Sequence, residues 1–264
     1  MSTPIPDRPR RVLSVNICRE LVSVEHAGAR ELTGHFKTPV SALGGEAGGR
    51  VRVTRDGLEG DRIADARHHG GPDMAIYGIS YETHWRWAAE LGRSDIGPGA
   101  FGENLTLDGM PDDQVCIGDL YRVRPAPSHV RTHAQSSGGA GAPDVPHEGG
   151  GAPDASGEPL GPLLQVTIPR GPCWKLGVAM RDPAFPKRFL ATCRVGFYLR
   201  VVELGDEPTI GPGDTLELVG HAPFVPTPRA GVEGRAGDGS AGEATSSERL
   251  TVEAATRGKY FKGA

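Results

Sequence analysis

The residue with the clearest chemical potential is a cysteine in the segment IPRGPCWKLG, residues 168–177. Cys173 follows a proline, which restricts the backbone, and Arg170 and Lys175 flank it. Neighbouring cations favour the thiolate form, which acts as a nucleophile or as a ligand for a soft metal. Free cysteines are, however, most often small buried core residues. The local sequence alone leaves these two interpretations evenly balanced.

The other three cysteines lack this setting. Cys18 and Cys116 lie in alternating, strand-like patterns and are predicted to be core residues, whereas Cys193 is an intermediate case because Arg194 follows it. No CxxC pair and no histidine at zinc-ligand spacing accompanies any of them. Four cysteines in 264 residues are too few for a disulfide scaffold, so reduced thiols in a cytoplasmic compartment are expected.

Two further polar clusters precede this segment. The first, at residues 59–78, is a turn-rich stretch with two adjacent glycines that allow close approach to a ligand, and it carries Asp61, Arg62, Asp65, His68, His69 and Asp73. Asp61 suits a structural anchor within its turn better than a catalytic base, and each histidine alone is most simply a hydrogen-bonded loop residue. The second cluster, GPGAFGENLTLDG at 97–109, presents Glu103 and Asn104, whose groups suit heterocycle edges as well as capping.

Short strand-like runs bounded by Gly, Pro or Asp dominate the ordered part of the chain. They lie at residues 13–17, 50–54, 121–124, 164–168, 197–202 and 215–219. Runs this short and frequent favour a mainly β fold, an antiparallel barrel, over a βαβ sheet. The sequence also predicts a helix over 81–91, with Ser80 at its N-cap and Gly92 at its end, and shorter helices over 183–190 and 250–261.

Glycine and proline are concentrated in two stretches. The chain has 39 Gly and 23 Pro, and most of the excess over average usage falls in residues 125–162 and 222–248, which contain few aliphatic side chains. Such segments cannot bury enough apolar surface to offset the entropy of ordering, so both are predicted to be flexible. The first lies between two strand-like runs, which indicates a long insertion in a hairpin connection, most simply a spacer.

Composition excludes several classes of partner. The formal net charge is −4, which argues against a nucleic-acid footprint or a polybasic membrane patch. No apolar run reaches the roughly 18 residues needed to span a bilayer. The N-terminal residues MSTPIPDRPRR also lack the apolar core of a signal peptide.

Five motifs in order, HHGGPDMAIYGISYETHW, PGAFGENLTLDGM, VCIGDLYRV, IPRGPCWKL and CRVGFYLRVVELG, strongly resemble the MOSC domain, the C-terminal domain type of molybdenum cofactor sulfurases. They are most similar to its stand-alone branch, which includes 6-hydroxylaminopurine reductase-type proteins. The resemblance covers residues 33–220 apart from the insertion at 125–162, with 1–32 as an N-terminal strand and lead-in and 221–264 as a flexible region with a short helix. It implies a closed β-barrel similar to the pyruvate-kinase insert domain.

The resemblance also implies a molybdopterin-type molybdenum cofactor, with Cys173 as the thiolate ligand of the metal. Because this cofactor is anionic, cations near Cys173 are candidates for holding it, and we predict this role for Arg170, Lys175, Arg194 and Arg200. Three residues of the polar clusters could read the pterin edge or gate the substrate, namely Arg62, His69 and Asn104. Homodimerisation is a further expectation, although the C-terminal helical region of this branch is reduced here to LTVEAATRGKYF.

Three functions are compatible with these features. The first is a molybdenum-dependent reductase that detoxifies N-hydroxylated compounds; its electrons would come from a separate reductase protein, because the chain carries no flavin, haem or iron–sulfur signature. The second is a carrier or handling module for the cofactor or its sulfur, and the third is a barrel that binds a small ligand without turnover. The domain also occurs fused to pyridoxal phosphate enzymes, but this length holds no such site. The stand-alone architecture favours the reductase.

Overall fold

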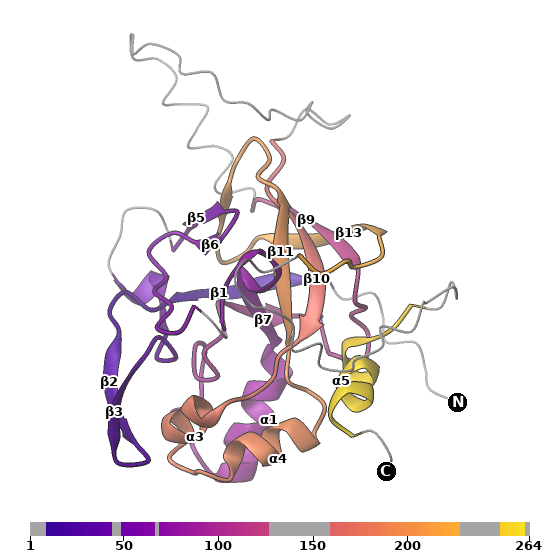
Figure 1. The fold of residues 1–264 in the computed structure, drawn as a ribbon. Helices are drawn as coiled ribbons and strands as arrows, with labels where there is room; N and C mark the ends of the chain where they lie inside the picture. The colour runs from indigo at the N-terminus through magenta and orange to yellow at the C-terminus, as the bar shows by residue number, and fades with distance from the viewer. Residues whose placement is uncertain (1–8, 44–48, 67–68, 127–158, 228–248, 262–264) are drawn as a thin grey trace, which may run out of the picture.

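The computed structural model describes residues 9–43, 49–66, 69–126, 159–227 and 249–261. Seven strands form a closed barrel (Figure 1): β1 (Arg11–Ile17), β7 (Ile76–Ser80), β8 (Leu105–Asp108), β9 (Asp119–Arg124), β10 (Leu163–Pro169), β11 (Phe197–Glu203) and β13 (Thr215–His221). Their order is β13-β9-β10-β11-β7-β8-β1, and the pairing of Arg11 with Thr215 closes the ring. The predicted mainly β, closed-barrel fold is confirmed.

One pair of barrel strands departs from the antiparallel pattern. β7 and β8 run parallel, while the other pairs around the barrel are antiparallel. Parallel neighbours need a crossover connection, and the helix α1 (Tyr81–Leu91) supplies it. The bounds of α1 are those predicted, and Gly92 ends the helix in the left-handed conformation with φ 60°.

The alternation of side chains along the strands builds two cores. On β11, Phe197 and Leu199 belong to the cluster of buried side chains that fills the barrel, whereas Tyr198 between them belongs to a second cluster outside it. This outer cluster packs Trp87 of α1 against Phe185 and the side chains of the neighbouring helices. The helices therefore bury the outer face of β7 and β11.

In the described part of the chain, three helices follow β10. α3 (Trp174–Met180) was not predicted, whereas α4 (Phe185–Ala191) and α5 (Val252–Tyr260) overlap the predicted segments 183–190 and 250–261. Figure 1 shows α1, α3 and α4 together at one end of the barrel, with α5 at its side. The sequence of α3 contains a glycine, Gly177, which weakens the helical pattern. In the structure this glycine lies close to the backbone of Asp182 and Pro183.

Shorter strands decorate the barrel. β2 (Val22–His26) and β3 (Ala29–Thr33) form a hairpin that the sequence did not indicate, β4 (Thr38–Pro39) pairs with β1, and β5 (Val51–Thr54), β6 (Gly57–Leu58) and β12 (Thr209–Ile210) form a small sheet. β1 itself is a full member of the barrel, although it precedes residue 33, where the resemblance begins.

The long insertion is flanked as predicted. β9 and β10 are antiparallel neighbours, with Tyr121 opposite Leu164, so the segment between them is a hairpin connection. Most of the two stretches predicted to be flexible, residues 127–158 and 228–248, lies outside the described residues. Within the described ranges, no helix is long and apolar enough to cross a membrane.

Candidate functional site

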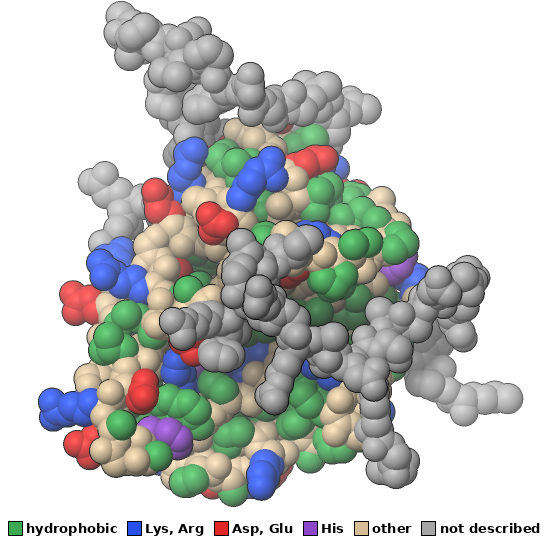
Figure 2. Space-filling view, in the orientation of Figure 1, with side chains coloured by type: hydrophobic (Ala, Val, Ile, Leu, Met, Phe, Trp, Pro, Cys, Tyr) green, Lys and Arg blue, Asp and Glu red, His purple; other side chains and the backbone are tan. Residues whose placement is uncertain are grey.

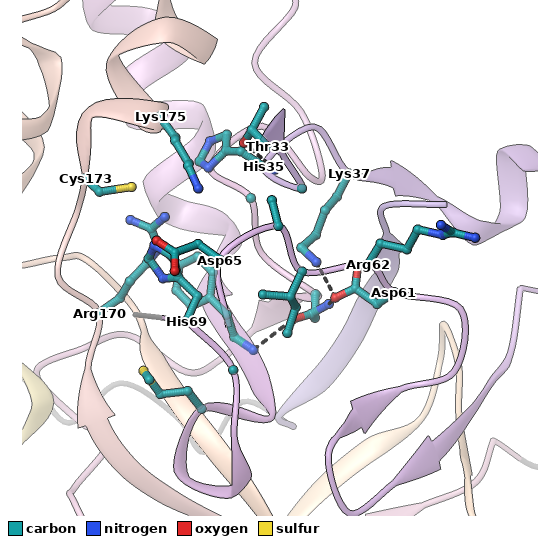
Figure 3. A pocket seen from close by; sticks show the side chains of 18 of the residues that line it. Thr33, His35, Lys37, Asp61, Arg62, Asp65, His69, Arg170, Cys173 and Lys175 are labelled. Atoms are coloured by element: carbon teal, nitrogen blue, oxygen red, sulfur yellow. Dashed lines mark hydrogen bonds and ion pairs between the residues drawn. The ribbon is translucent and has the colours of Figure 1, made fainter. Parts of the chain in front are cut away.

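A pocket lies where loops from distant parts of the sequence meet beside the barrel (Figure 3). Its walls come from residues 33–37, 61–65, 69–77, 102–104 and 170–175, together with Tyr198. The space between these walls, together with the open solvent at its mouth, is about 610 Å³. Figure 2 shows basic side chains in a hollow of the surface near the centre of the view.

Cys173 lies at one end of this pocket. β10 ends at Pro169 and α3 begins at Trp174, so the cysteine occupies the short connection between strand and helix, in an extended conformation with φ −117°. Its side chain is partly accessible, whereas Cys18, Cys116 and Cys193 are buried. Of the four cysteines, all of which the structure describes, only Cys173 lines the pocket.

Arg170 brings a buried positive charge to the same end. The residue is 4% exposed, and its guanidinium lies 4.9 Å from the centre of the Tyr77 ring. Its Nη1 has no hydrogen-bond partner among the described residues. Burial raises the pKa of Tyr77 and of Tyr198, so both phenols stay neutral and neither balances the charge. An anionic ligand group would complement this unpaired donor.

His35 is the second buried group with an unpaired atom in the pocket. The residue is 8% exposed, and Nε2 of its ring has no partner in the described part of the chain. Burial lowers the pKa of His35 well below its ordinary value, and the nearby charges of Arg170 and Lys37 lower it further. The imidazole is therefore neutral at physiological pH.

The opposite end of the pocket is internally paired. Asp61 accepts hydrogen bonds from the backbone N–H of Cys18 (2.7 Å) and from Nδ2 of Asn104 (2.8 Å), and it forms an ion pair with Lys37. Asn104 also accepts a hydrogen bond from the backbone N–H of Tyr77 at 3.1 Å. The predicted role of Asp61 as a structural anchor agrees with these contacts. The amide of Asn104 is engaged within the protein on both sides.

The charges around the pocket are predominantly positive. Four basic residues line it, Lys37, Arg62, Arg170 and Lys175, against two acidic ones, Asp61 and Asp65. Figure 3 shows the guanidinium of Arg62 directed away from the cavity. Asp61 pairs with Lys37. Figure 3 shows Asp65 at the Cys173 end, beside Arg170 and Lys175, so the two basic side chains there outnumber the acidic one. Such a pocket attracts anions. In the described ranges, no three His, Cys, Asp or Glu side chains gather into a cluster that could hold a bare metal ion.

A hairpin contacts the segment that carries Cys173. His26, at the turn between β2 and β3, stacks on the ring of Trp174, with ring centres 4.0 Å apart and planes 7° apart. The turn itself is tight, because Ala27 and Gly28 both have positive φ. The hairpin thus reaches from β1 to the start of α3, beside the pocket.

The structure brings together six of the eight predicted site residues: Cys173, Arg170, Lys175, Arg62, His69 and Asn104 all line the pocket. The two others lie elsewhere. Arg194 follows the turn at Cys193 and lines a different depression beside Trp85 and Arg86. Arg200 projects from β11 but bonds to Gln165 at 2.9 Å and to the carbonyl of Val225 at 3.0 Å. Neither arginine lines the pocket that contains Cys173.

Among the pocket residues that sequence reasoning missed are two tyrosines, a histidine and a lysine. Tyr77 and Tyr198 lie inside quoted motifs, but nothing local shows which face of the strand they take. His35 and Lys37, in TGHFKTPV, flank Phe36 in an alternating pattern that could have been read as a polar face of an extended segment.

Comparison with known proteins identifies the relatives of this chain. It is 30% identical to the uncharacterized protein YflK of Bacillus subtilis over 208 residues, which are 79% of this chain and 72% of YflK. It is 29% identical to the protein YiiM of Escherichia coli over 67% of this chain and 62% of YiiM. A Gibberella moniliformis protein named reductase is 31% identical, but the match spans only 27% of that longer protein.

Solved structures and family patterns agree with the architecture. The crystal structure of YiiM from Geobacillus stearothermophilus matches with a TM-score of 0.53 and 24% identity over 94% of this chain and 83% of that one, which shows a shared fold. The pattern of the MOSC domain matches residues 65–139 and 147–217, more than half of the sequence and with the Cys173 segment inside it. The chain belongs to the MOSC domain family.

Proposed function

We propose that this chain binds a molybdopterin-type molybdenum cofactor in the pocket and reduces N-hydroxylated compounds with electrons from a separate reductase protein. The observation that carries the proposal is the Cys173 end of the pocket. There, the one pocket-lining cysteine of the described chain lies beside the buried Arg170, whose Nη1 has no partner within the described ranges. A thiol and an unpaired cation together suit an anionic group that carries a soft metal.

The donor set of the pocket fits the chemistry of this cofactor. Cys173 would be the protein ligand of the metal, and Arg170 and Lys175 would bind anionic oxygen and sulfur atoms of the cofactor. Arg62 and His69 line the same cavity and are the proposed contacts with the rest of the ligand. Asn104 would offer few further hydrogen bonds to the ligand, because its side-chain amide is already hydrogen-bonded to Asp61 and to the backbone of Tyr77.

The reaction requires two electrons and two protons for each substrate, because an N-hydroxylated compound is converted into the amine and water. The cofactor, when bound, supplies the two-electron chemistry. The chain itself would position the substrate at the Cys173 end and shield it from water with the buried side chains of Tyr77 and Tyr198. The relative named reductase supports this class of reaction.

Metal and pterin analysis tests the proposal directly. Protein purified from a host that makes the cofactor is expected to contain about one molybdenum per chain, and Cys173→Ala is expected to lose it. The matched controls are Cys18→Ala and Cys116→Ala, which remove buried thiols that do not line the pocket and should retain the metal. An unchanged molybdenum content in Cys173→Ala would show that Cys173 is not the ligand of the metal.

A turnover assay separates the reductase from the carrier function. With a reduced viologen as the electron donor, the loaded protein is expected to reduce an amidoxime or a hydroxylaminopurine catalytically. A loaded protein that shows no turnover but transfers cofactor or sulfur to an apo-enzyme would replace the reductase with a carrier. A protein that binds no pterin would contradict both.

A further inference from the structure

The ring of His35 is fixed in the pocket by contacts on several sides. Its backbone N–H donates to Oγ1 of Thr33 at 3.0 Å, and its ring hydrogen-bonds with the backbone of Ala100. Its Nδ1 also lies against Gly102, where a Cβ would come within 2.6 Å of that atom. Gly102 has φ +77°, so both its conformation and this contact require glycine. The direction of the opposite ring atom, Nε2, is therefore set by the fold.

This Nε2 atom is buried without a partner in the part of the chain that the structure describes. Leaving a buried polar atom unpaired costs free energy, and such atoms are rare unless a ligand or water completes them. Figure 3 shows His35 at the same end of the pocket as Cys173, Arg170 and Lys175. His35 and Cys173 therefore line one and the same cavity, which a single ligand can fill.

The chemistry of Nε2 is that of a hydrogen-bond acceptor. Burial and the charges of Arg170 and Lys37 keep the ring neutral, and the hydrogen bond to Ala100 assigns the ring proton to Nδ1. Nε2 then presents a lone pair, which accepts a hydrogen bond from an O–H or N–H group and does not bind an anion. It differs in this respect from the lysine and arginine side chains that line the same cavity.

The other acceptors at the pocket are arranged differently. The carboxylate of Asp61 is occupied by Cys18, Asn104 and Lys37, at the opposite end. Asp65, which Figure 3 shows beside Arg170, is a second carboxylate of the pocket. Nε2 of His35 differs from both carboxylates because it is a neutral acceptor without a partner in the described ranges. The hydroxyl of a hydroxylamine or an amidoxime is a neutral donor of matching character, and its O-alkylated form is not.

We propose that Nε2 of His35 accepts a hydrogen bond from the hydroxyl of the N-hydroxylated substrate and so positions the N–O bond at the Cys173 end. This inference rests on the proposed function and deepens it, since it names the group of the substrate that the pocket recognises. His35 forms and breaks no bond; it is a substrate-binding residue distinct from those proposed to hold the cofactor.

Two variants of His35 and two ligands form the test. His35→Asn keeps an amide group near the position of Nδ1 and removes the acceptor at the position of Nε2, whereas His35→Gln places an amide oxygen near Nε2. The ligands are benzamidoxime and its O-methyl ether, and their dissociation constants are measured by calorimetry with molybdenum-loaded protein, alongside KM and kcat for benzamidoxime.

The native chain is expected to bind benzamidoxime about tenfold more tightly than the ether, as one hydrogen bond allows. In His35→Asn this preference should vanish and KM should rise by the same factor, with molybdenum content unchanged and kcat changed less. His35→Gln should restore most of the preference.

Three outcomes would overturn parts of this account, and they differ from one another. An unchanged ligand preference in a folded, loaded His35→Asn would overturn the role of His35 and leave the reductase intact. Loss of molybdenum in that variant would also overturn it, by placing His35 on the cofactor. A loaded native chain without amidoxime reduction would overturn the proposed function, and the inference with it.

Discussion

The two ends of the pocket use similar residues for different purposes. At one end, Asp61, Lys37 and Asn104 bond to one another and to the backbone of Cys18. At the other end, Arg170 and His35 are equally buried, yet each keeps a nitrogen atom without a partner in the described ranges. The first arrangement is complete within the described residues, whereas the second leaves two buried nitrogen atoms open to a hydrogen bond from outside the protein.

The difference shows how a polar cluster can be classified before its ligand is known. Burial alone does not distinguish the two ends, because Asp61 and Lys37 have side chains only 8% exposed. Satisfaction of hydrogen bonds does distinguish them. Mutations should therefore affect folding at the Asp61 end and ligand binding at the Arg170 end.

The largest effect on stability is expected from Asp61→Ala. This change leaves the buried ammonium of Lys37 without its counter-ion and removes acceptors from Cys18 and Asn104. Breaking a buried ion pair by removing one partner costs about 3–5 kcal/mol, to be measured by denaturant unfolding. Glu59→Ala, at an exposed position of the same turn, is the control and should change little. A loss below about 1 kcal/mol would contradict the structural role of this end.

A smaller effect on the free energy of unfolding, about 3 kcal/mol, is expected from the ionisation of a buried acid outside the pocket. Burial raises the pKa of Asp112 to about 7, and its Oδ2 has no partner among the described groups, while its Oδ1 accepts the N–H of Gly196 at 2.7 Å. Because the folded-state pKa lies above the ordinary value of 3.8, the stability it contributes is complete at low pH and is lost as the pH rises toward 7.

The test of Asp112 compares the native chain with Asp112→Asn, which keeps an acceptor for Gly196. Between pH of about 4.5 and 7.5, the free energy of unfolding of the native chain should fall by about 3 kcal/mol more than that of the variant. Molybdenum content should be equal in the two proteins. A loss of metal in Asp112→Asn would mean that this unpaired atom, like those of the pocket, serves the ligand.

The smallest effect on stability is expected from Arg170→Met, at the Cys173 end. The variant removes a buried charge but keeps an apolar side chain over Tyr77. Replacing a buried charge by an apolar group of similar size is often neutral, so the free energy of unfolding without cofactor should stay within about 1 kcal/mol. Molybdenum content should nevertheless fall strongly, while turnover per bound molybdenum falls less. A folded variant with full metal content would show that the two ends do not differ as described.

Much of the fold followed from local patterns. The helix at 81–91 and the strands around Tyr121, Leu164 and Phe197 were predicted because their periodicity and their Gly or Pro boundaries are local properties. The hairpin β2–β3 was missed because its strands are mostly exposed and carry little apolar alternation. α3 was missed because seven residues containing a glycine form no clear helical pattern, and packing against α4 stabilises them.

For the site, the sequence by itself indicated the family and singled out Cys173, which lines the pocket. The motif around Cys173, with its proline and two cations, pointed to the pocket, and so did the turn that contains Arg62 and His69. These features are local properties of the sequence, so they can be recognised without knowledge of the fold.

Only the tertiary structure decided which of the charged residues line the pocket. Closure of the barrel and the packing of its loops place His35 and Lys37 in one pocket with a segment more than a hundred residues away in the sequence. Arg200 instead hydrogen-bonds to Gln165, and Arg194 lines another depression. The physical reason is that the direction of a side chain depends on strand register and on the partners available in space. Neither can be read from residue type or spacing.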